Sequence, residues 1–148
     1  MAFHVHHAHT DGDAIIYFPK SNVIHMGDTY FKGRYPYIDL GSGGSVSGVL
    51  NALDKVIFLA DSETKIIPGH GTLSNKEELM EYREVITTIY DRVKKAIASD
   101  MTLEEIKASN LTKEWDEEWG TGFINPERFM DILYSDLTKD DKTEKKKE

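Results

Sequence analysis

The segment "HHAHTDGDAIIYFP", residues 6–19, decides how the rest of this sequence is interpreted. It passes from clustered histidines through an acidic turn with one glycine into a short apolar run. That run, residues 14–18, has the β-branched and aromatic side chains of a strand, and Pro19 ends it. His9 lies before this run, at the end of another predicted strand, residues 3–9. The segment is either a metal site at the mouth of a sheet or a histidine-rich strand without chemistry.

The composition describes an ordinary globular domain. The chain has 148 residues, of which 39% are hydrophobic and 30% charged. The net charge of -8 argues against nucleic acid and anionic membranes as partners, because both bind basic surfaces. The sequence has no cysteine, so any metal must be held by His, Asp or Glu. It has no spanning apolar run and no signal-peptide pattern, so we expect a soluble protein, while its compartment stays open.

The predicted strands share an unusual feature. In residues 14–18, Ala14, Ile16 and Phe18 fall on one face, while Ile15 and Tyr17 fall on the other, so both faces are apolar. A sheet with one face in water would alternate polar and apolar side chains. The predicted helices can cover one face, and something else must cover the second. The predicted strands are residues 3–9, 14–18, 22–26 and 64–71.

Helical spacing marks the remaining elements. A helix is predicted from residue 45 to about 55, and residues 56–60 either continue it or begin a strand, with the helix favoured. Capping boxes at Ser74/Glu77 and Thr102/Glu105, and a proline at 126, start three more helices. The fold class is therefore α/β (α+β), with one small mixed sheet and helices on one face. The domain spans residues 1–137, and the charged tail 138–148 is predicted to be disordered.

Three polar residues stand beside glycine at strand tips. They are His9 in "AHTDGD", Asp28 in "HMGDTYF" and His70 in "PGHG". Glycine permits tight turns and the close approach of a ligand. Imidazole and carboxylate together suit zinc and similar divalent ions. Each position alone is also explained as a polar cap or a turn, so the interpretation depends on their combination.

The combination resembles a known family. "AHTDGDAIIYFP", "NVIHMGDTYF" and "IIPGHG" resemble, in this order, the second half of a metallo-β-lactamase superfamily domain. "RYPYIDLGSGGSV" and "EWDEEWGTGFINPERFM" look like one branch of that superfamily and its C-terminal extension. The resemblance covers roughly residues 3 to 137. It implies half of an αββα sandwich that carries one or two zinc ions at the sheet edge.

The resemblance also implies a role for each strand-tip residue. His9 would bind the first metal, Asp28 would bridge both metals, and His70 would bind the second, which makes Asp28 and His70 catalytic as well. A hydroxide between the ions would attack a carbonyl or phosphoryl centre of a small-molecule substrate. The family's H-x-H-x-D-H motif, which supplies most other ligands, does not occur in this sequence. Half of the sandwich is therefore expected to be absent, in agreement with the doubly apolar strands.

Other motifs allow two interpretations. His4, His6 and His7 either substitute for the missing ligands or are ordinary strand residues, and the second is favoured. His25 is expected to pack beside the site without binding metal. The segment "GSGGS", residues 41–45, either receives an anion at a helix start or simply forms the turn there. The two tryptophans at 115 and 119 are expected to be packing residues.

Two functions follow from this reasoning. The first is a zinc-dependent hydrolase, weak or inactive as this chain alone because a partner or second copy must supply ligands. The second is a non-catalytic half-domain that keeps relic ligands. Both predict a homodimer or higher oligomer, since an apolar sheet face of several hundred Å² is unusual on a soluble monomer.

Overall fold

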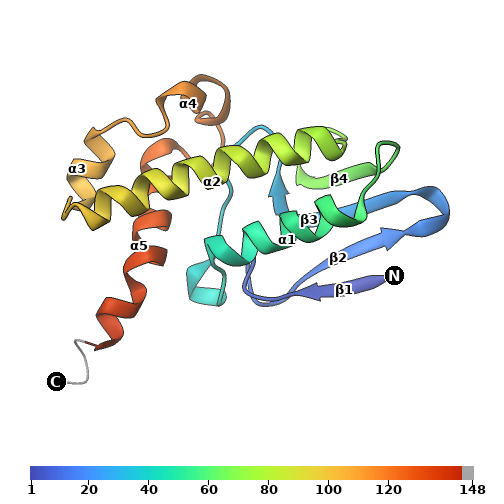
Figure 1. The fold of residues 1–148 in the computed structure, drawn as a ribbon, viewed down its shortest axis with the longest axis horizontal. Helices are drawn as coiled ribbons and strands as arrows, with labels where there is room; N and C mark the ends of the chain where they lie inside the picture. Colours follow the sequence, from blue (N-terminus) through green and yellow to red (C-terminus); the bar gives the residue numbers. More distant parts are fainter. Residues whose placement is uncertain (145–148) are drawn as a thin grey trace.

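The computed structural model describes residues 1–144, which form one four-stranded sheet with helices packed on one of its faces (Figure 1). None of the helices in this part of the chain is long and apolar enough to cross a membrane. The elements in chain order are β1 Ala2–Val5, β2 Asp13–Phe18, η1 Pro19–Ser21, β3 Val23–Phe31, η2 Leu40–Ser42, α1 Val46–Leu59, β4 Lys65–His70, α2 Lys76–Ala98, α3 Leu103–Ala108, α4 Lys113–Trp119 and α5 Pro126–Glu144.

The sheet is mixed, as predicted, and its topology places several chain segments at one edge. The strand order is β1-β2-β3-β4; the first three strands are antiparallel, and β4 runs parallel to β3. The parallel strands β3 and β4 therefore end at the same edge, and β2, antiparallel to β3, begins there. The pairing of β3 with β4 is irregular around Gly27. This irregularity lies within β3, which extends beyond the predicted range 22–26 to Phe31.

One sheet face is covered by helices and the other is open. Helices α1 and α2 lie over the same face, while α3, α4 and α5 gather beyond the C-terminal half of α2 (Figure 1). Ile15, Ile24 and Ile66 point into the covered face and are fully buried. On the opposite face Ile16 is only half-buried and Phe18 is 50% exposed. The apolar second face expected from the sequence therefore lacks cover in the described chain.

Most of the predicted helices are confirmed. Helix α1 continues through Leu59, so residues 56–59 are helical and begin no strand. Helix α3 starts with the predicted capping box, in which the Thr102 side chain accepts from the Glu105 amide while the Glu105 carboxylate accepts from the Thr102 amide. Pro126 opens α5 as predicted. Helix α4 was not predicted as a separate element.

Three further sequence-based boundaries were also wrong. The strand expected at residues 3–9 ends at Val5, because His7 adopts a positive φ of 51° and the chain turns. The N-cap of α2 is Asn75, whose side chain accepts from the Glu78 amide, one position after the predicted Ser74. The tail predicted to begin at residue 138 starts inside α5, which continues through Glu144; residues 145–148 lie outside the described range.

Candidate metal centre

Asp28 and His70 lie together near the C-terminal ends of β3 and β4. His70 Nε2 lies 3.2 Å from Asp28 Oδ1, and the two side chains are 48% and 42% exposed. The His70 ring stacks on Phe31, with ring centroids 4.8 Å apart and an interplanar angle of 11°. The parallel pairing of the two strands brings these residues together, although 42 positions separate them in the sequence. Both can still reach a ligand from solvent.

Glycines at the end of β4 make this contact possible. A Cβ atom at Gly69 would collide with Asp28 Oδ1 and with the Gly27 carbonyl. Gly71 has a φ of +105°, a conformation that L side chains rarely adopt, and a Cβ there would crowd Lys32. The two glycines around His70 therefore have separate roles. Gly69 leaves room for the carboxylate of Asp28, and Gly71 turns the chain away after the imidazole.

His9 reaches the same edge from the turn before β2. Its Nδ1 lies 3.3 Å from Asp13 Oδ1, and its side chain is 17% exposed. The His9 ring centroid is 6.4 Å from that of Phe31 and 5.7 Å from that of Tyr37. Phe31 therefore contacts both histidine rings. Asp28 reaches this cluster through His70, but within the described residues the donor atoms of His9, Asp28 and His70 do not all lie within 4.8 Å of one another.

The turn that carries His9 is fixed by the start of α1. The Asp39 amide donates to the His9 carbonyl at 2.8 Å, and the Ser45 amide donates to the Ala8 carbonyl at 3.0 Å. A Cβ atom at Gly44 or Gly48 would collide with the backbone of this turn. The glycines of "GSGGS" and the helix after it therefore let α1 approach the histidine segment closely.

The amide at the start of α1 already has an anionic partner. The Val46 amide donates to Asp136 Oδ2 at 3.2 Å, and Asp136 is buried with an exposure of 6%. Ser45 caps the helix by accepting from the Gly48 amide at 3.0 Å. These contacts favour the turn interpretation of residues 41–45 over an anion site.

A cavity of about 160 Å³ opens beside Asp28 and His70. Its walls are mostly aromatic and apolar, with one guanidinium group from Arg34. Tyr35 is buried there and donates to Asp116 Oδ1 at 2.7 Å; burial and this carboxylate raise the pKa of Tyr35, so its phenol stays protonated. The other lining residues are Phe31, Tyr37, Phe123 and Ile124.

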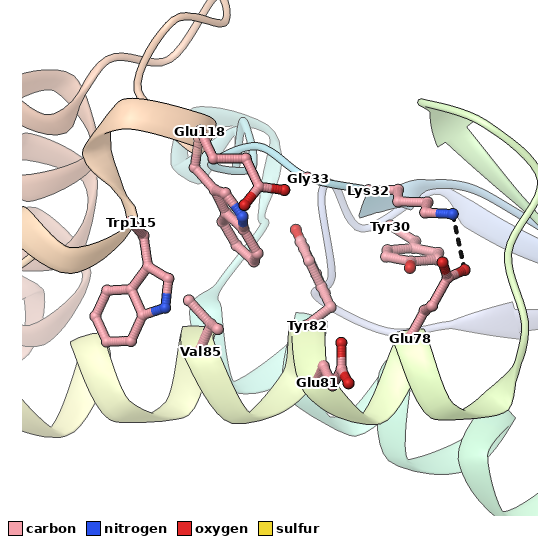
Figure 2. A pocket seen from close by; sticks show the side chains of 10 residues that line it. Tyr30, Lys32, Gly33, Glu78, Glu81, Tyr82, Val85, Trp115 and Glu118 are labelled. Carbon is pink, nitrogen blue, oxygen red and sulfur yellow. Dashed lines mark hydrogen bonds and ion pairs between the residues drawn. The ribbon is translucent and has the colours of Figure 1, made fainter.

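A second cavity, of about 290 Å³, lies between the end of β3, α2 and α4 (Figure 2). On the right side of the cavity in Figure 2, Lys32 Nζ forms an ion pair with Glu78 Oε2 at 2.7 Å. Burial raises the pKa of Tyr30 to about 12. Trp119 is buried and stacks on Tyr82 with centroids 5.4 Å apart, as expected for a packing residue. The acidic and aromatic lining lacks imidazole, so this cavity is the weaker candidate for a metal centre.

The residue types at the sheet edge suit a divalent metal ion, and the structure brings Asp28 and His70 together but does not bring a His9 donor within 4.8 Å of both. Two imidazoles and one carboxylate are a typical ligand set for zinc. The carboxylate of Asp13 beside His9 Nδ1 leaves Nε2 available, which is the usual arrangement around a metal-bound histidine. The sequence reasoning missed Asp13 as a partner of His9, although its spacing of four residues from His9 was visible.

His25 occupies a different position from the three. Its Nδ1 accepts from the Gly27 amide at 3.1 Å, so it supports the irregular turn of β3 just before Asp28. The ring itself is exposed on the open sheet face. This placement agrees with a supporting role beside the site.

Residues 1–70 match the family model described as the metallo-beta-lactamase superfamily. Residues 1–70 belong to the metallo-beta-lactamase superfamily. The matched range ends at His70 and contains His9 and Asp28, so it includes every residue of the candidate centre. Members of this superfamily typically bind metal ions.

Relatives of this superfamily segment are distant and longer. A hydroxyacylglutathione hydrolase from Bartonella quintana (strain Toulouse) is 31% identical over 123 residues, which are 74% of this chain and 45% of that protein. The chain thus spans less than half the length of this curated relative.

Similarity to a solved structure extends past residue 70. The stereoselective inverting sec-alkylsulfatase Pisa1 from Pseudomonas sp. superposes with a TM-score of 0.70 and 15% identity, over 90% of this chain and 23% of the sulfatase. The BLEG-1 B3 metallo-beta-lactamase has a TM-score of 0.49 and 28% identity, over 58% of this chain and 40% of that chain. The sulfatase similarity includes most of the helical C-terminal part and concerns the fold alone.

Proposed function

We propose that this chain provides part of the metal centre of a hydrolase that cleaves ester or thioester bonds. The observation that carries the proposal is the pairing of Asp28 with His70 beside a cavity, with Phe31 in ring contact with both His70 and His9. In this proposal the three residues hold zinc. When bound, the metal polarises a carbonyl group and lowers the pKa of water.

The residues of the chain have distinct tasks in this proposal. Asp13 keeps the His9 ring in the tautomer that leaves Nε2 free. Phe31 stacks on His70 and fixes the plane of its imidazole. Gly69 allows Asp28 to lie beside His70. Packing therefore keeps Asp28 and His70 close before a metal binds, whereas a His9 donor must approach them to complete the ligand set.

The cavity lining supports a small substrate with an apolar part and a negative charge. Phe31, Tyr37 and Phe123 offer apolar surface, and Arg34 can bind a carboxylate through two parallel hydrogen bonds. The similar Bartonella protein is named as a hydrolase of a hydroxyacylglutathione, a thioester. A hydroxyacyl thioester with a carboxylate-bearing thiol is accordingly the substrate class that we propose.

We expect slow turnover by this chain alone. Its 148 residues contain no H-x-H-x-D-H motif, so three donors must hold the metal without the ligands that this motif supplies in the family. Three protein ligands and a water can complete a zinc site. Full activity is expected only when another polypeptide segment or a second copy contributes donors.

The test measures zinc content and thioester hydrolysis in the same preparations. We expect one bound zinc to be lost from the Asp28→Asn and His70→Ala variants, and turnover to fall at least about 100-fold in parallel. Asp54→Asn is the matched control, because Asp54 pairs with Arg83 on the helical layer and lies outside the site. Turnover that persists unchanged in both site variants would rule out this centre as its source.

A second candidate function is non-catalytic self-association, and the open sheet face favours it. Ile16 and Phe18 leave apolar surface on that face. In this candidate two copies pack these faces together and form a homodimer, while His9, Asp28 and His70 are relics. Metal-free protein without turnover that still dimerises would support it over the hydrolase.

A further inference from the structure

A second group of metal-binding side chains lies at the end of β1, on residues outside the proposed hydrolase centre. One donor atom from each of His4, His6 and Asp11 lies within 4.8 Å of the other two. His4 is on β1, between the more buried Phe3 and Val5, so its side chain faces the open side of the sheet. All three residues of the group are exposed to solvent.

Local contacts hold these donors close together. The His4 and His6 rings meet edge to face, with centroids 4.1 Å apart. His4 Nε2 lies 2.5 Å from the Asp11 carbonyl oxygen. A carbonyl can only accept, so Nε2 carries the proton and Nδ1 keeps a lone pair for a metal. An imidazole fixed in this way by a backbone carbonyl is common around bound zinc.

The turn that carries Asp11 is also fixed. The Asp11 amide donates to the Ser42 carbonyl at 3.0 Å, and the His7 amide lies 3.3 Å from Asp11 Oδ1 and donates to it. The same turn is held by the start of α1. Asp11 therefore has a defined position relative to the two imidazoles without any metal, which lowers the entropy cost of binding one.

We propose that His4, His6 and Asp11 form a surface site for a divalent transition-metal ion of the zinc class. Two imidazoles and a carboxylate favour zinc over calcium and magnesium, which prefer oxygen ligands. The exposure of the site leaves coordination positions to water or to a ligand from a partner. His9 points instead toward Phe31 and Tyr37, so the two sites use different donors.

The first experiment removes the hydrolase centre and titrates what remains. The full chain, without an added histidine tag, carries His9→Ala, Asp28→Asn and His70→Ala and is titrated with ZnCl₂ in a calorimeter. One zinc equivalent at micromolar concentration is expected. Adding His4→Ala and His6→Ala to the triple variant should lower its zinc affinity at least about tenfold. Adding His25→Ala, which removes another exposed histidine, should leave the affinity unchanged.

The second experiment keeps the hydrolase centre intact and covers the case in which the triple variant does not fold. Zinc per chain is measured by elemental analysis after equilibrium dialysis of the wild-type chain and of the His4→Ala/His6→Ala variant. A decrease of one equivalent is expected, whatever the occupancy of the other site. An unchanged zinc count, or a folded triple variant that takes up no zinc, would overturn the proposal.

Discussion

Single residues at the sheet edge decide whether the proposed centre can form. The Asp28 carboxylate lies against the backbone of β4 because Gly69 has no side chain. Its neighbour His70 is held by stacking on Phe31. The sequence indicated Asp28 and His70 through their glycine neighbours, and the structure gives a physical reason for two of them, most directly for Gly69. Substitution of that glycine is therefore a sharp test.

Gly69→Ala is expected to weaken zinc binding at least about tenfold and to destabilise the fold by about 1–3 kcal/mol, because the new methyl group must displace Asp28 or the Gly27 carbonyl. Calorimetric zinc titration and thermal unfolding measure the two effects. Gly122→Ala is the control, since the nearest atom to a Cβ there, Arg34 Cβ, is 3.6 Å away. Equal zinc affinity in both variants would contradict the steric explanation.

Between elements, one ion pair connects the end of β3 with the first turn of α2. Lys32 Nζ lies 2.7 Å from Glu78 Oε2, and Ser74 Oγ donates to the same oxygen at 2.9 Å. The hydrogen bond from Lys32, with help from Ser74, holds the pKa of Glu78 below its usual value. Figure 2 shows the pair at the rim of the second cavity.

The stability contributed by this pair should depend on pH in one direction. Glu78 has a lower pKa folded than unfolded, so its contribution is present above the unfolded pKa of about 4.3 and disappears as the pH falls through the folded value. We expect Glu78→Gln to lower the thermal midpoint at pH 7 and to converge with wild type in acid. Glu77→Gln, in the same turn, should change little at either pH. A difference in thermal midpoint between wild type and Glu78→Gln that stays the same at every pH would contradict this pH dependence.

The helices and strands also show which features can be predicted from the sequence alone. Helices α1, α3 and α5 were predicted because apolar spacing, a capping box or a proline acts locally. The end of β1 was missed because the positive φ at His7 depends on the packing of α1 against the turn. The contact of Asp13 with His9 was also missed, because a spacing of four residues does not bring two side chains together unless the chain folds into that turn.

At the scale of the whole molecule, the sheet has one covered and one open face. Ile16 pairs with His25 across β2 and β3, and His25 pairs with Ile67 on β4, so a mixed apolar and polar row crosses the open face. Phe18 adds an exposed ring at the strand end. This two-sided apolar character was readable from the sequence, because it depends only on alternation along a strand. What covers the face was not readable.

Self-association is the prediction that belongs to this scale. The chain is expected to dimerise at micromolar concentration in sedimentation velocity, and Phe18→Lys should shift the population toward monomer by placing a charge in the interface. Phe58→Lys is the matched control, because Phe58 is 88% exposed on α1 in the helical layer. A wild-type chain that stays monomeric, or an equal shift in both variants, would argue against packing through this face.

The contact between Val46 and Asp136 joins the start of α1 to the last helix, 90 positions later in the chain. The start of α1 packs against the backbone turn that carries His9 and supports it. During synthesis His9 leaves the ribosome long before Asp136, which completes the support of its turn. The nascent chain therefore acquires a fully held His9 only once α5 has emerged, so zinc is expected to load after the synthesis of this helix.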